Sequence, residues 1–318
     1  MEKLLITHNV KFCIFIVYAI MLALTFGMNI VGFIKKNADL SNFKQRMKSF
    51  WLIIILFTLA FAWNKITAFL FLAFISYLAL KEYLSLISTR QADRRVLLWA
   101  YLSIPIQFYF IYTDWLVMFY LFVPLYMFLL IPIRMVTIGD TEGFLKACGT
   151  IHWGLMTTVY ALGYLMMYLA LPVGKNPAGG DVGLLLFILF ITVFNDFAQY
   201  VWGKSIGKHK IIPKISPNKT WEGFIGGIIT TAALTAIFGP YLTPLTLKQS
   251  IFAGIALAVA GFLGDVTMSA IKRDIGVKDT GNLLPGHGGI LDRLDSLIFT
   301  APLFFHYVVY LHFKGLLN

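Results

Sequence analysis

Charged residues are scarce in this sequence: they make up 13% of its 318 residues, whereas hydrophobic residues reach 59%. A typical soluble domain has roughly 25% charged residues. The composition therefore excludes an ordinary soluble domain and predicts a protein of the lipid bilayer. No part of the sequence has the composition of a separate soluble domain.

Cysteine is also scarce, since the sequence contains only Cys13 and Cys148. Both lie in or beside apolar runs and lack the spacing of metal ligands, so neither a disulfide framework nor a zinc site is predicted. The first apolar run, at about 12–34, is longer than the core of a signal peptide and lacks a small-residue cleavage site. We expect it to remain as an anchoring span.

Ten apolar runs separated by short polar loops predict an all-α fold, a polytopic transmembrane helix bundle of about nine or ten spans. The run at 50–62 is short for a span, because thirteen residues rise only about 20 Å as a helix. A re-entrant or interfacial bend stays open there. The runs lie near 12–34, 50–62, 66–84, 97–112, 115–136, 151–173, 183–202, 222–243, 251–271 and 295–313.

Polar residues suited to catalysis are nearly missing from the first 150 residues, which are apolar and aromatic with short basic loops. We therefore divide the chain into N-terminal transmembrane scaffold helices at 1–150 and a C-terminal transmembrane catalytic region at 151–318. After Ala178, Gly, Pro, Asp, Asn, Lys and His gather in two segments that flank the runs at 222–243 and 251–271.

Basic residues exceed acidic ones, which gives a net charge of +11. In the alternating topology, 20 Lys and Arg fall on one side of the membrane and six on the other. The positive-inside rule assigns the richer side to the cytoplasm, so the charge needs no nucleic-acid partner and we expect none. The richer loops lie within 35–49, 81–96, 134–150, 203–220 and 272–294.

The run at 251–271 ends in a polar stripe, because Asp265, Ser269 and Lys272 share one helical face. An acid at the edge of a span is costly unless it is paired, hydrated or bound to metal, which makes Asp265 a candidate functional residue. The alternative is a plain salt bridge from Asp265 to Lys272 or Arg273.

A glycine-rich turn follows, with Gly286, Gly288 and Gly289 around His287. Glycines let backbone amides approach an anion closely, although a plain tight turn is the commoner meaning of such a cluster. Cationic and acidic side chains surround this turn, and that mixture fits a phosphate ester with a divalent cation. They are Lys272, Arg273, Lys278, Arg293, Asp265, Asp279, Asp292 and Asp295. Helix capping is the alternative role of the last two acids.

A third polar segment begins with Asp196 near the end of one apolar run and continues to the start of the next. The residues at 203–208 superficially resemble a Walker loop, but the spacing is one residue short and His209 stands where Ser or Thr is needed. The stretch 216–223 has the pattern of an ordered helix entry that could lie near an anion. Its candidate binding residues are Ser216, Lys219, Thr220 and Glu222.

These segments together resemble the phosphatidate cytidylyltransferase family, also called CDP-diacylglycerol synthases. Over 27 residues the family signature is present without a gap or substitution. It comprises Ser269, Lys272–Arg273, Lys278–Asp279, Gly281, Pro285–Gly289 and Asp292–Asp295. The stretch 216–223 and the pattern from Asp196 to Tyr200 also resemble the family, whereas residues before 150 carry no specific match.

The resemblance implies transfer of a cytidylyl group from CTP to phosphatidate, giving CDP-diacylglycerol and pyrophosphate for phospholipid synthesis. It implies that Asp265 and Asp292 hold Mg²⁺, with or without a second cation. It also implies that the backbone of 286–289 binds the triphosphate and that Asp295 has a supporting role. The side chains that would bind phosphates are Lys219, Lys272, Arg273, Lys278 and Arg293. We expect His287 to donate a hydrogen bond rather than act as a base, because a phosphomonoester is mostly ionised at pH 7.

These residues suit a site at the headgroup plane, since a lipid substrate stays in the leaflet while a nucleotide arrives from the cytosol. We expect a bacterial inner membrane, with the site facing the cytoplasm and a homodimer left open. One alternative is a CTP-dependent transferase or kinase acting on another lipid phosphate or a polyprenol. Another is an anion transporter, which would need ionisable residues at mid-depth in several spans. A third is an inactive scaffold, against which the unbroken set of acids and bases speaks.

Overall fold

The computed structural model describes residues 4–34, 41–87, 94–171, 176–286 and 288–317. Within these ranges the regular structure is helical, apart from two isolated bridges, Lys210 with Thr220 and Leu284 with Gly288. The predicted all-α fold is confirmed.

Ten helical segments of span length follow one another in the described residues, and two of them contain a short π-helical stretch. They are α1 (His8–Ile34), α2 (Ser41–Trp63), α3 (Lys65–Leu86), α4 (Arg94–Tyr112), α5 (Leu116–Leu121) continuing through η2 (Phe122–Met127) into α6 (Phe128–Val136), α7 (Phe144–Leu155) continuing through η3 (Met156–Ala161) into α8 (Leu162–Ala170), α9 (Gly183–Ile206), α10 (Trp221–Leu242), α11 (Leu247–Asp274), and α12 (Leu291–Leu294) leading into α13 (Leu297–Phe313).

Nine of these described segments are long and apolar enough to cross a membrane, and α4, which contains Pro105, is the tenth helix. The predicted count of about nine or ten spans is confirmed, and the chain is an integral membrane protein. The short run at 50–62 belongs to the 23-residue helix α2, because the polar residues from Ser41 onward add more than two turns to it.

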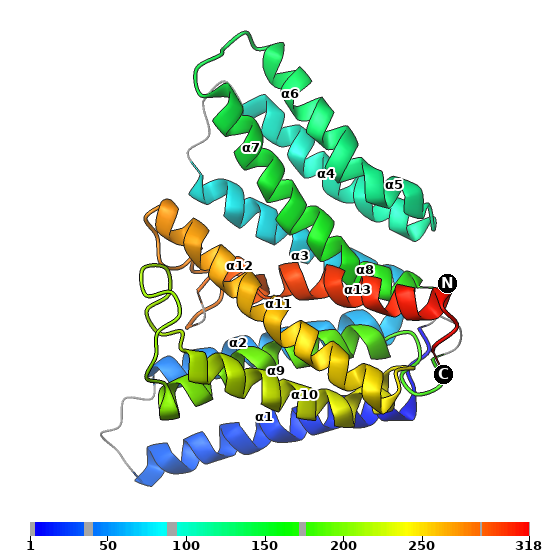
Figure 1. Cartoon of the computed structure of the whole chain (residues 1–318), viewed down its shortest axis with the longest axis vertical. Coiled ribbons are helices and arrows are strands. Elements are labelled where there is room, and N and C mark those ends of the chain that lie inside the picture. The colour runs from blue at the N-terminus through cyan, green and yellow to red at the C-terminus, as the bar shows by residue number, and fades with distance from the viewer. Residues whose placement is uncertain (1–3, 35–40, 88–93, 172–175, 287, 318) are drawn as a thin grey trace.

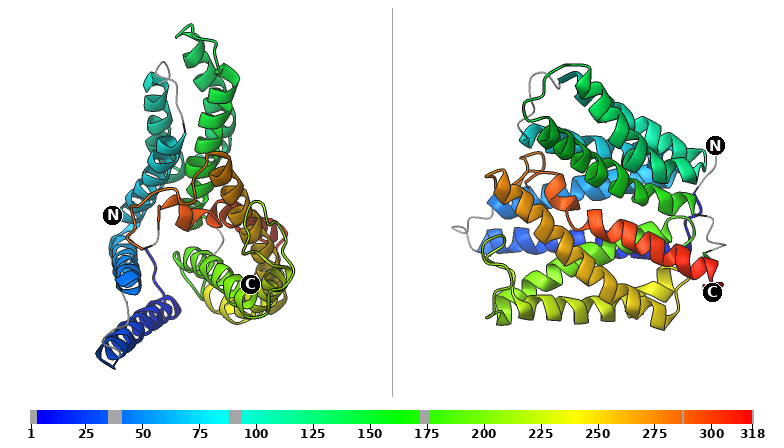
Figure 2. Two further views of the ribbon diagram at one scale, coloured as in Figure 1. Left: turned by 90° about the vertical axis from the view of Figure 1, so that its left-hand side faces the viewer. Right: turned by 45° about the horizontal axis from the view of Figure 1, so that its top comes forward.

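The helices that carry the polar segments form one group in the bundle. Helix α10 packs most extensively against α9 and α11, and α11 continues the contacts to α13. Helix α13 also packs on α8, which joins this group to α3 and α4 (Figure 1). Helix α1 lies at the edge of the bundle, as Figure 2 shows from a second side, and only 6% of its most apolar stretch is buried.

Glycine sets how closely these helices approach one another. A Cβ atom on Gly227 of α10 would lie 2.3 Å from Cγ of Gln199 on α9. A Cβ atom on Gly264 of α11 would lie 2.8 Å from the backbone oxygen of Asp295, at the start of the last span. Small residues at such crossings let helix backbones approach closely in a membrane. The acids that α9, α11 and the last span carry are therefore brought together.

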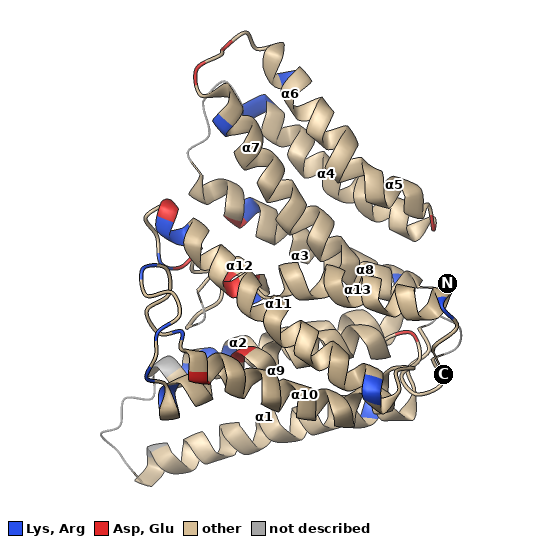
Figure 3. Ribbon diagram, viewed as in Figure 1, with Lys and Arg blue, Asp and Glu red and all other residues tan. Residues whose placement is uncertain are grey.

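Many of the Lys and Arg residues lie at one end of the bundle, where the α9–α10 and α11–α12 connections are found (Figure 3). Arg273, at the end of α11, joins the two connections, because it donates to the backbone oxygens of Ile215 at 3.3 Å and Val277 at 3.2 Å. The two polar segments therefore lie at the same end of the bundle. The division of the chain at residue 150 falls inside the continuous helix Phe144–Ala170, and it remains a prediction.

Candidate active site

Three aspartates from separate helices form the centre of the site. Asp196 comes from α9, Asp265 from α11, and Asp295 from the junction of α12 and α13. The hydroxyl of Ser296, the residue after Asp295, donates to Oδ1 of Asp196 at 3.0 Å, and a Cβ atom on Gly264, the residue before Asp265, would lie 2.8 Å from the backbone oxygen of Asp295. Neighbouring carboxylates repel one another, and a cation beside them would offset that repulsion. We call these three residues the acid cluster.

A lysine from the α9–α10 connection partly neutralises the acid cluster. Nζ of Lys219 forms an ion pair with Oδ2 of Asp265, lies 3.5 Å from Oε1 of Gln199 and lies 5.6 Å from the centre of the Phe262 ring. Both charged side chains keep contact with solvent, with 19% exposure for Lys219 and 23% for Asp265. This ion pair is therefore partly accessible rather than sealed in the bundle.

The alternative salt bridge from Asp265 to Lys272 or Arg273 is wrong. Seven residues along a helix rise about 10 Å, so Lys272 starts far along the axis from Asp265. Ser269, one turn from Asp265, does share its face, and its hydroxyl donates to Oδ1 of Asp265 at 3.3 Å. The acid finds its cation on another segment of the chain.

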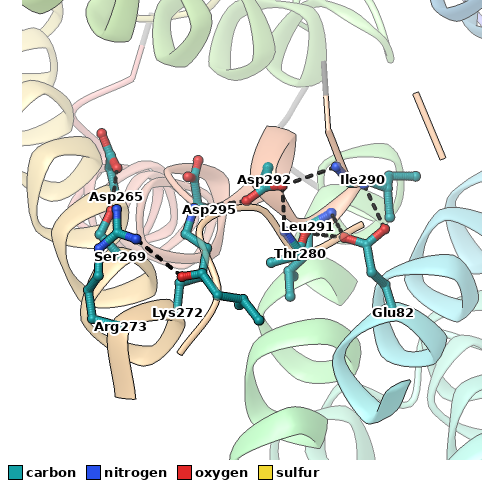
Figure 4. A network of polar contacts seen from close by, with 12 residues as sticks. Glu82, Asp265, Ser269, Lys272, Arg273, Thr280, Ile290, Leu291, Asp292 and Asp295 are labelled. Atoms are coloured by element: carbon teal, nitrogen blue, oxygen red, sulfur yellow. Dashed lines mark hydrogen bonds and ion pairs between the residues drawn. The ribbon is translucent and has the colours of Figure 1, made fainter. Parts of the chain in front are cut away.

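Lys272 instead pairs with Asp292, and this pair is buried. Nζ of Lys272 lies 2.8 Å from Oδ1 of Asp292, and the two side chains are 12% and 4% exposed. The other oxygen, Oδ2, accepts the backbone N–H groups of Thr280 at 2.8 Å and Gly289 at 3.0 Å (Figure 4). Asp292 thus has partners for both oxygens within the protein and fixes the two ends of the loop between Thr280 and Gly289.

A polar cavity of about 500 Å³ lies beside this loop. Gly286 and Gly288 line it with φ angles of +76° and +81°, a backbone conformation that glycine adopts without steric cost. Three cations also line it: Arg46, Lys278 and Arg293. Arg293 lies between Asp292 and Asp295 in the sequence, so the cavity adjoins the segment that carries Asp295. Its remaining lining residues are Asp279, Asn282, Leu284 and Pro285.

The remaining residues of the α9–α10 connection build its local structure. The Thr220 hydroxyl caps α10 by accepting the N–H of Gly223 at 3.2 Å, as the predicted helix entry requires. Glu222 contacts Nδ1 of His209 at 2.6 Å and accepts the backbone N–H groups of Lys208 and His209. The backbone oxygen of Ser216 accepts from the N–H of Lys219 at 3.3 Å, which shapes the turn that presents Lys219 to Asp265.

Arg273 also forms hydrogen bonds that support the local structure. Besides Ile215, it donates through Nη1 to the backbone oxygen of Val277 at 3.2 Å, and so it ties the end of α11 to both polar connections. Its predicted contact with phosphate stays a prediction. His287 lies outside the described residues.

The acid cluster offers hard oxygen ligands that suit Mg²⁺, which proteins hold with one or two carboxylates, substrate phosphates and water. Asp265 and its neighbours Asp295 and Asp196 fit that description. In the part of the chain that the structure describes, no three His, Cys, Asp or Glu side chains form a ready-made metal cage. The predicted pair of ligands, Asp265 and Asp292, stays a prediction, and both oxygens of Asp292 already accept hydrogen bonds.

Three residues of the loop environment come from the N-terminal region and were missed by sequence reasoning. Glu82 on α3 accepts hydrogen bonds from Thr280, Ile290 and Leu291. Ser49 donates to the backbone oxygen of Pro285 at 2.8 Å, and Arg46 to that of Gly286 at 3.0 Å. An acid within an apolar span is a recognisable signal, and it could have drawn attention to Glu82.

The fold and this site define an integral membrane protein of helical spans, with a cavity lined by charged residues at one end of the bundle. The chain belongs to the cytidylyltransferase family, whose model matches residues 44–311. The family is that of the nucleotidyltransferases that use CTP, and the family resemblance predicted from the signature is confirmed.

Two kinds of relative accompany this family match. The chain is 48% identical over 265 residues to the uncharacterized protein YnbB of Escherichia coli (strain K12), which covers 83% of this chain and 87% of that protein. It is 38% identical over 151 residues to a phosphatidate cytidylyltransferase of Staphylococcus saprophyticus and 40% identical over 152 residues to one of Staphylococcus aureus (strain COL). These matches span 47% of this chain and about half, 55%, of each of those relatives.

Proposed function

We propose that this protein transfers the cytidylyl group of CTP to phosphatidate at the cytoplasmic face of a bacterial inner membrane. An oxygen of the phosphatidate phosphate forms a bond to the α-phosphorus of CTP. The bond from that phosphorus to the oxygen bridging to the β-phosphate breaks, and pyrophosphate leaves. The products are CDP-diacylglycerol, a precursor for phospholipid synthesis, and pyrophosphate.

The observation that carries this proposal is the position of the acid cluster beside the cation-lined cavity. Phosphoryl transfer depends mainly on positioning and on offsetting negative charge, because the protein does little covalent chemistry. Lys219 and Lys272 lie at the carboxylates, while Arg46, Lys278 and Arg293 line the cavity. A nucleotide's phosphates fit such a lining, and a lipid headgroup can reach the same end of the bundle from the leaflet.

A bound Mg²⁺ would polarise phosphate oxygens and offset the charge that builds on them. Asp265 is the residue best placed to hold it, with Asp292 as the second predicted ligand. The chain's own contribution is to pair Asp265 with Lys219 and Asp292 with Lys272, and to hold the glycine turn open to the triphosphate.

The names of the staphylococcal relatives support phosphatidate as the acceptor. The relative that covers most of this chain is uncharacterized, so another lipid phosphate or a polyprenol is the alternative acceptor. Family membership favours either transferase over an anion transporter.

The direct test supplies detergent-purified protein with labelled CTP and Mg²⁺, and with either phosphatidate or a polyprenyl phosphate in separate reactions. We expect a labelled CDP-lipid and released pyrophosphate with phosphatidate. Product with the polyprenyl phosphate alone would assign the other acceptor. The absence of product with both lipids would overturn the proposal.

Replacing Arg46 with alanine is expected to raise the KM for CTP about tenfold, because a charged hydrogen bond contributes roughly 1.5–3 kcal/mol. The change in kcat should be smaller, since Arg46 is on the cavity wall rather than at the acid cluster. Steady-state kinetics with varied CTP measures both. Lys48→Ala, also exposed on α2 but absent from the cavity lining, is the control and should leave the KM unchanged. An unchanged KM in Arg46→Ala would contradict the binding of CTP in this cavity.

A further inference from the structure

Glu82 is the N-terminal residue most closely tied to the site. It lies near the C-terminal end of α3, and its carboxylate accepts three hydrogen bonds from the other end of the chain. The donors are the Thr280 hydroxyl, the N–H of Ile290 at 2.9 Å and the N–H of Leu291 at 3.0 Å (Figure 4). One side chain thus holds the loop at both of its ends.

Helix α3 itself gains nothing from a carboxylate at this position. The C-terminal end of a helix carries a partial negative charge, so an acid near it receives no stabilisation from the helix dipole. The N–H groups of Ile290 and Leu291 reverse this balance, because the start of the short helix α12 offers unpaired donors. The contact is therefore favourable only when the loop lies against α3.

Glu82 and Asp292 hold the same loop together. Thr280 donates its hydroxyl to Glu82 and its backbone N–H to Asp292. The next two donors are neighbours in sequence: the N–H of Gly289 bonds to Asp292, and the N–H of Ile290 bonds to Glu82. A change in the Glu82 contacts would therefore shift the segment that carries Asp292.

The close fit at Gly289 shows how little space separates the two segments. A Cβ atom at this position would lie 2.0 Å from Oε1 of Glu82 and 2.3 Å from the hydroxyl oxygen of Thr280. Under 3.0 Å something must shift, so any side chain at position 289 would displace the carboxylate. Glycine at 289 and glutamate at 82 are thus a matched pair.

We propose that Glu82 is a positioning residue for the transfer reaction: it sets the loop from Thr280 to Leu291 so that Asp292, Arg293 and the glycine turn keep the geometry that the reaction needs. This inference rests on the proposed function for its kinetic effect, whereas the effect on the loop itself does not. The N-terminal helices are accordingly part of the catalytic unit and more than a scaffold.

The test compares Glu82→Gln and Glu82→Asp with Lys81→Gln, an exposed neighbour in the same turn that serves as the control. Glutamine keeps the size but replaces one acceptor oxygen with a donor NH₂ group, which would face the loop donors. We expect kcat to fall about 10- to 100-fold, as for residues that orient a site from behind it. The KM for CTP should rise as well, because the glycine turn and Arg293 line the cavity. Glu82→Asp should retain more activity than Glu82→Gln, because it keeps both acceptor oxygens.

A second readout follows the loop without activity. We expect trypsin to cleave after the exposed Lys278 several-fold faster in Glu82→Gln than in the wild type, with a thermal midpoint close to that of the wild type. If Glu82→Gln fails to fold, Glu82→Asp is read in the same two assays, in which it should show the same changes to a smaller degree. Wild-type kcat and cleavage rate in the tested Glu82 variant would overturn the inference. A wild-type protein without any CDP-lipid product would instead overturn the proposed function, and the cleavage result would still decide the role of Glu82 in the loop.

Discussion

Replacing Asp265 with asparagine is expected to lower the rate of CDP-lipid formation by at least about 100-fold, since residues behind a metal site already cost 10- to 100-fold when changed. Asparagine keeps the volume of the side chain but not its charge. The acid cluster would then have less negative charge with which to hold a cation, while Lys219 would keep Gln199 and Phe262 as neighbours. Initial rates at saturating CTP and phosphatidate measure the effect.

The control for this substitution is Asp274→Asn at the exposed end of the same helix. It makes the same chemical change away from the acid cluster and should keep the wild-type rate. Both variants should unfold near the wild-type temperature, because Asp265 is 23% exposed and its loss leaves no sealed charge. Residual activity in Asp265→Asn should also require more Mg²⁺. Full activity at the wild-type Mg²⁺ requirement would exclude Asp265 as a ligand and would contradict the proposed chemistry.

The transmembrane architecture could be predicted from the sequence because each apolar run is a local property. The ends of the runs were less accurate. Helix α2 begins at Ser41, nine residues before the predicted run, since a helix continues through polar residues that extend beyond the hydrocarbon core. The meeting of the two polar connections was also predictable, because alternating spans place them on the same side.

The partners of individual charges could not be predicted in the same way. A shared helical face correctly placed Ser269 beside Asp265, but the cation of that acid, Lys219, comes from a different connection. The capping interpretation of the last two acids had a similar limit. The short helix α12 receives its acceptor from Glu82 on α3, while Asp292 accepts N–H groups of the preceding loop. Such contacts depend on how whole helices pack, which no local pattern records.

No site residue was predicted in the first 150 residues, because the contacts of that region with the site also depend on helix packing. Arg46, Ser49 and Glu82 are single polar residues in or beside apolar runs, and none of them belongs to a local motif. Packing brings all three to the loop between Thr280 and Leu291. A site assembled from distant single residues is detectable only once the helices are placed, whereas the signature at 269–295 is visible as one continuous stretch.

Replacing Lys272 with methionine is expected to lower the stability of the folded protein by about 3–5 kcal/mol, the cost of breaking a buried ion pair by removing one partner. Asp292 is 4% exposed, so its charge would lose its cation without gaining water. The two backbone N–H groups of Thr280 and Gly289 would remain but offset only part of that charge. Thermal unfolding in detergent measures the effect, and Lys248→Met, exposed near the start of the same helix, is the control that should unfold like the wild type.

The double variant Lys272→Met, Asp292→Asn separates charge from packing. Asparagine keeps one acceptor oxygen for the N–H groups of the loop and removes the unpaired charge, so part of the lost stability should return. A coupling of that sign is expected for residues in direct contact. Activity should stay low in both variants, because both lack the Lys272 ammonium group and the double variant also lacks the Asp292 carboxylate. A single Lys272→Met variant as stable as the wild type would mean that the loop N–H groups alone neutralise Asp292, and Lys272 would then be free to bind phosphate instead of serving the fold.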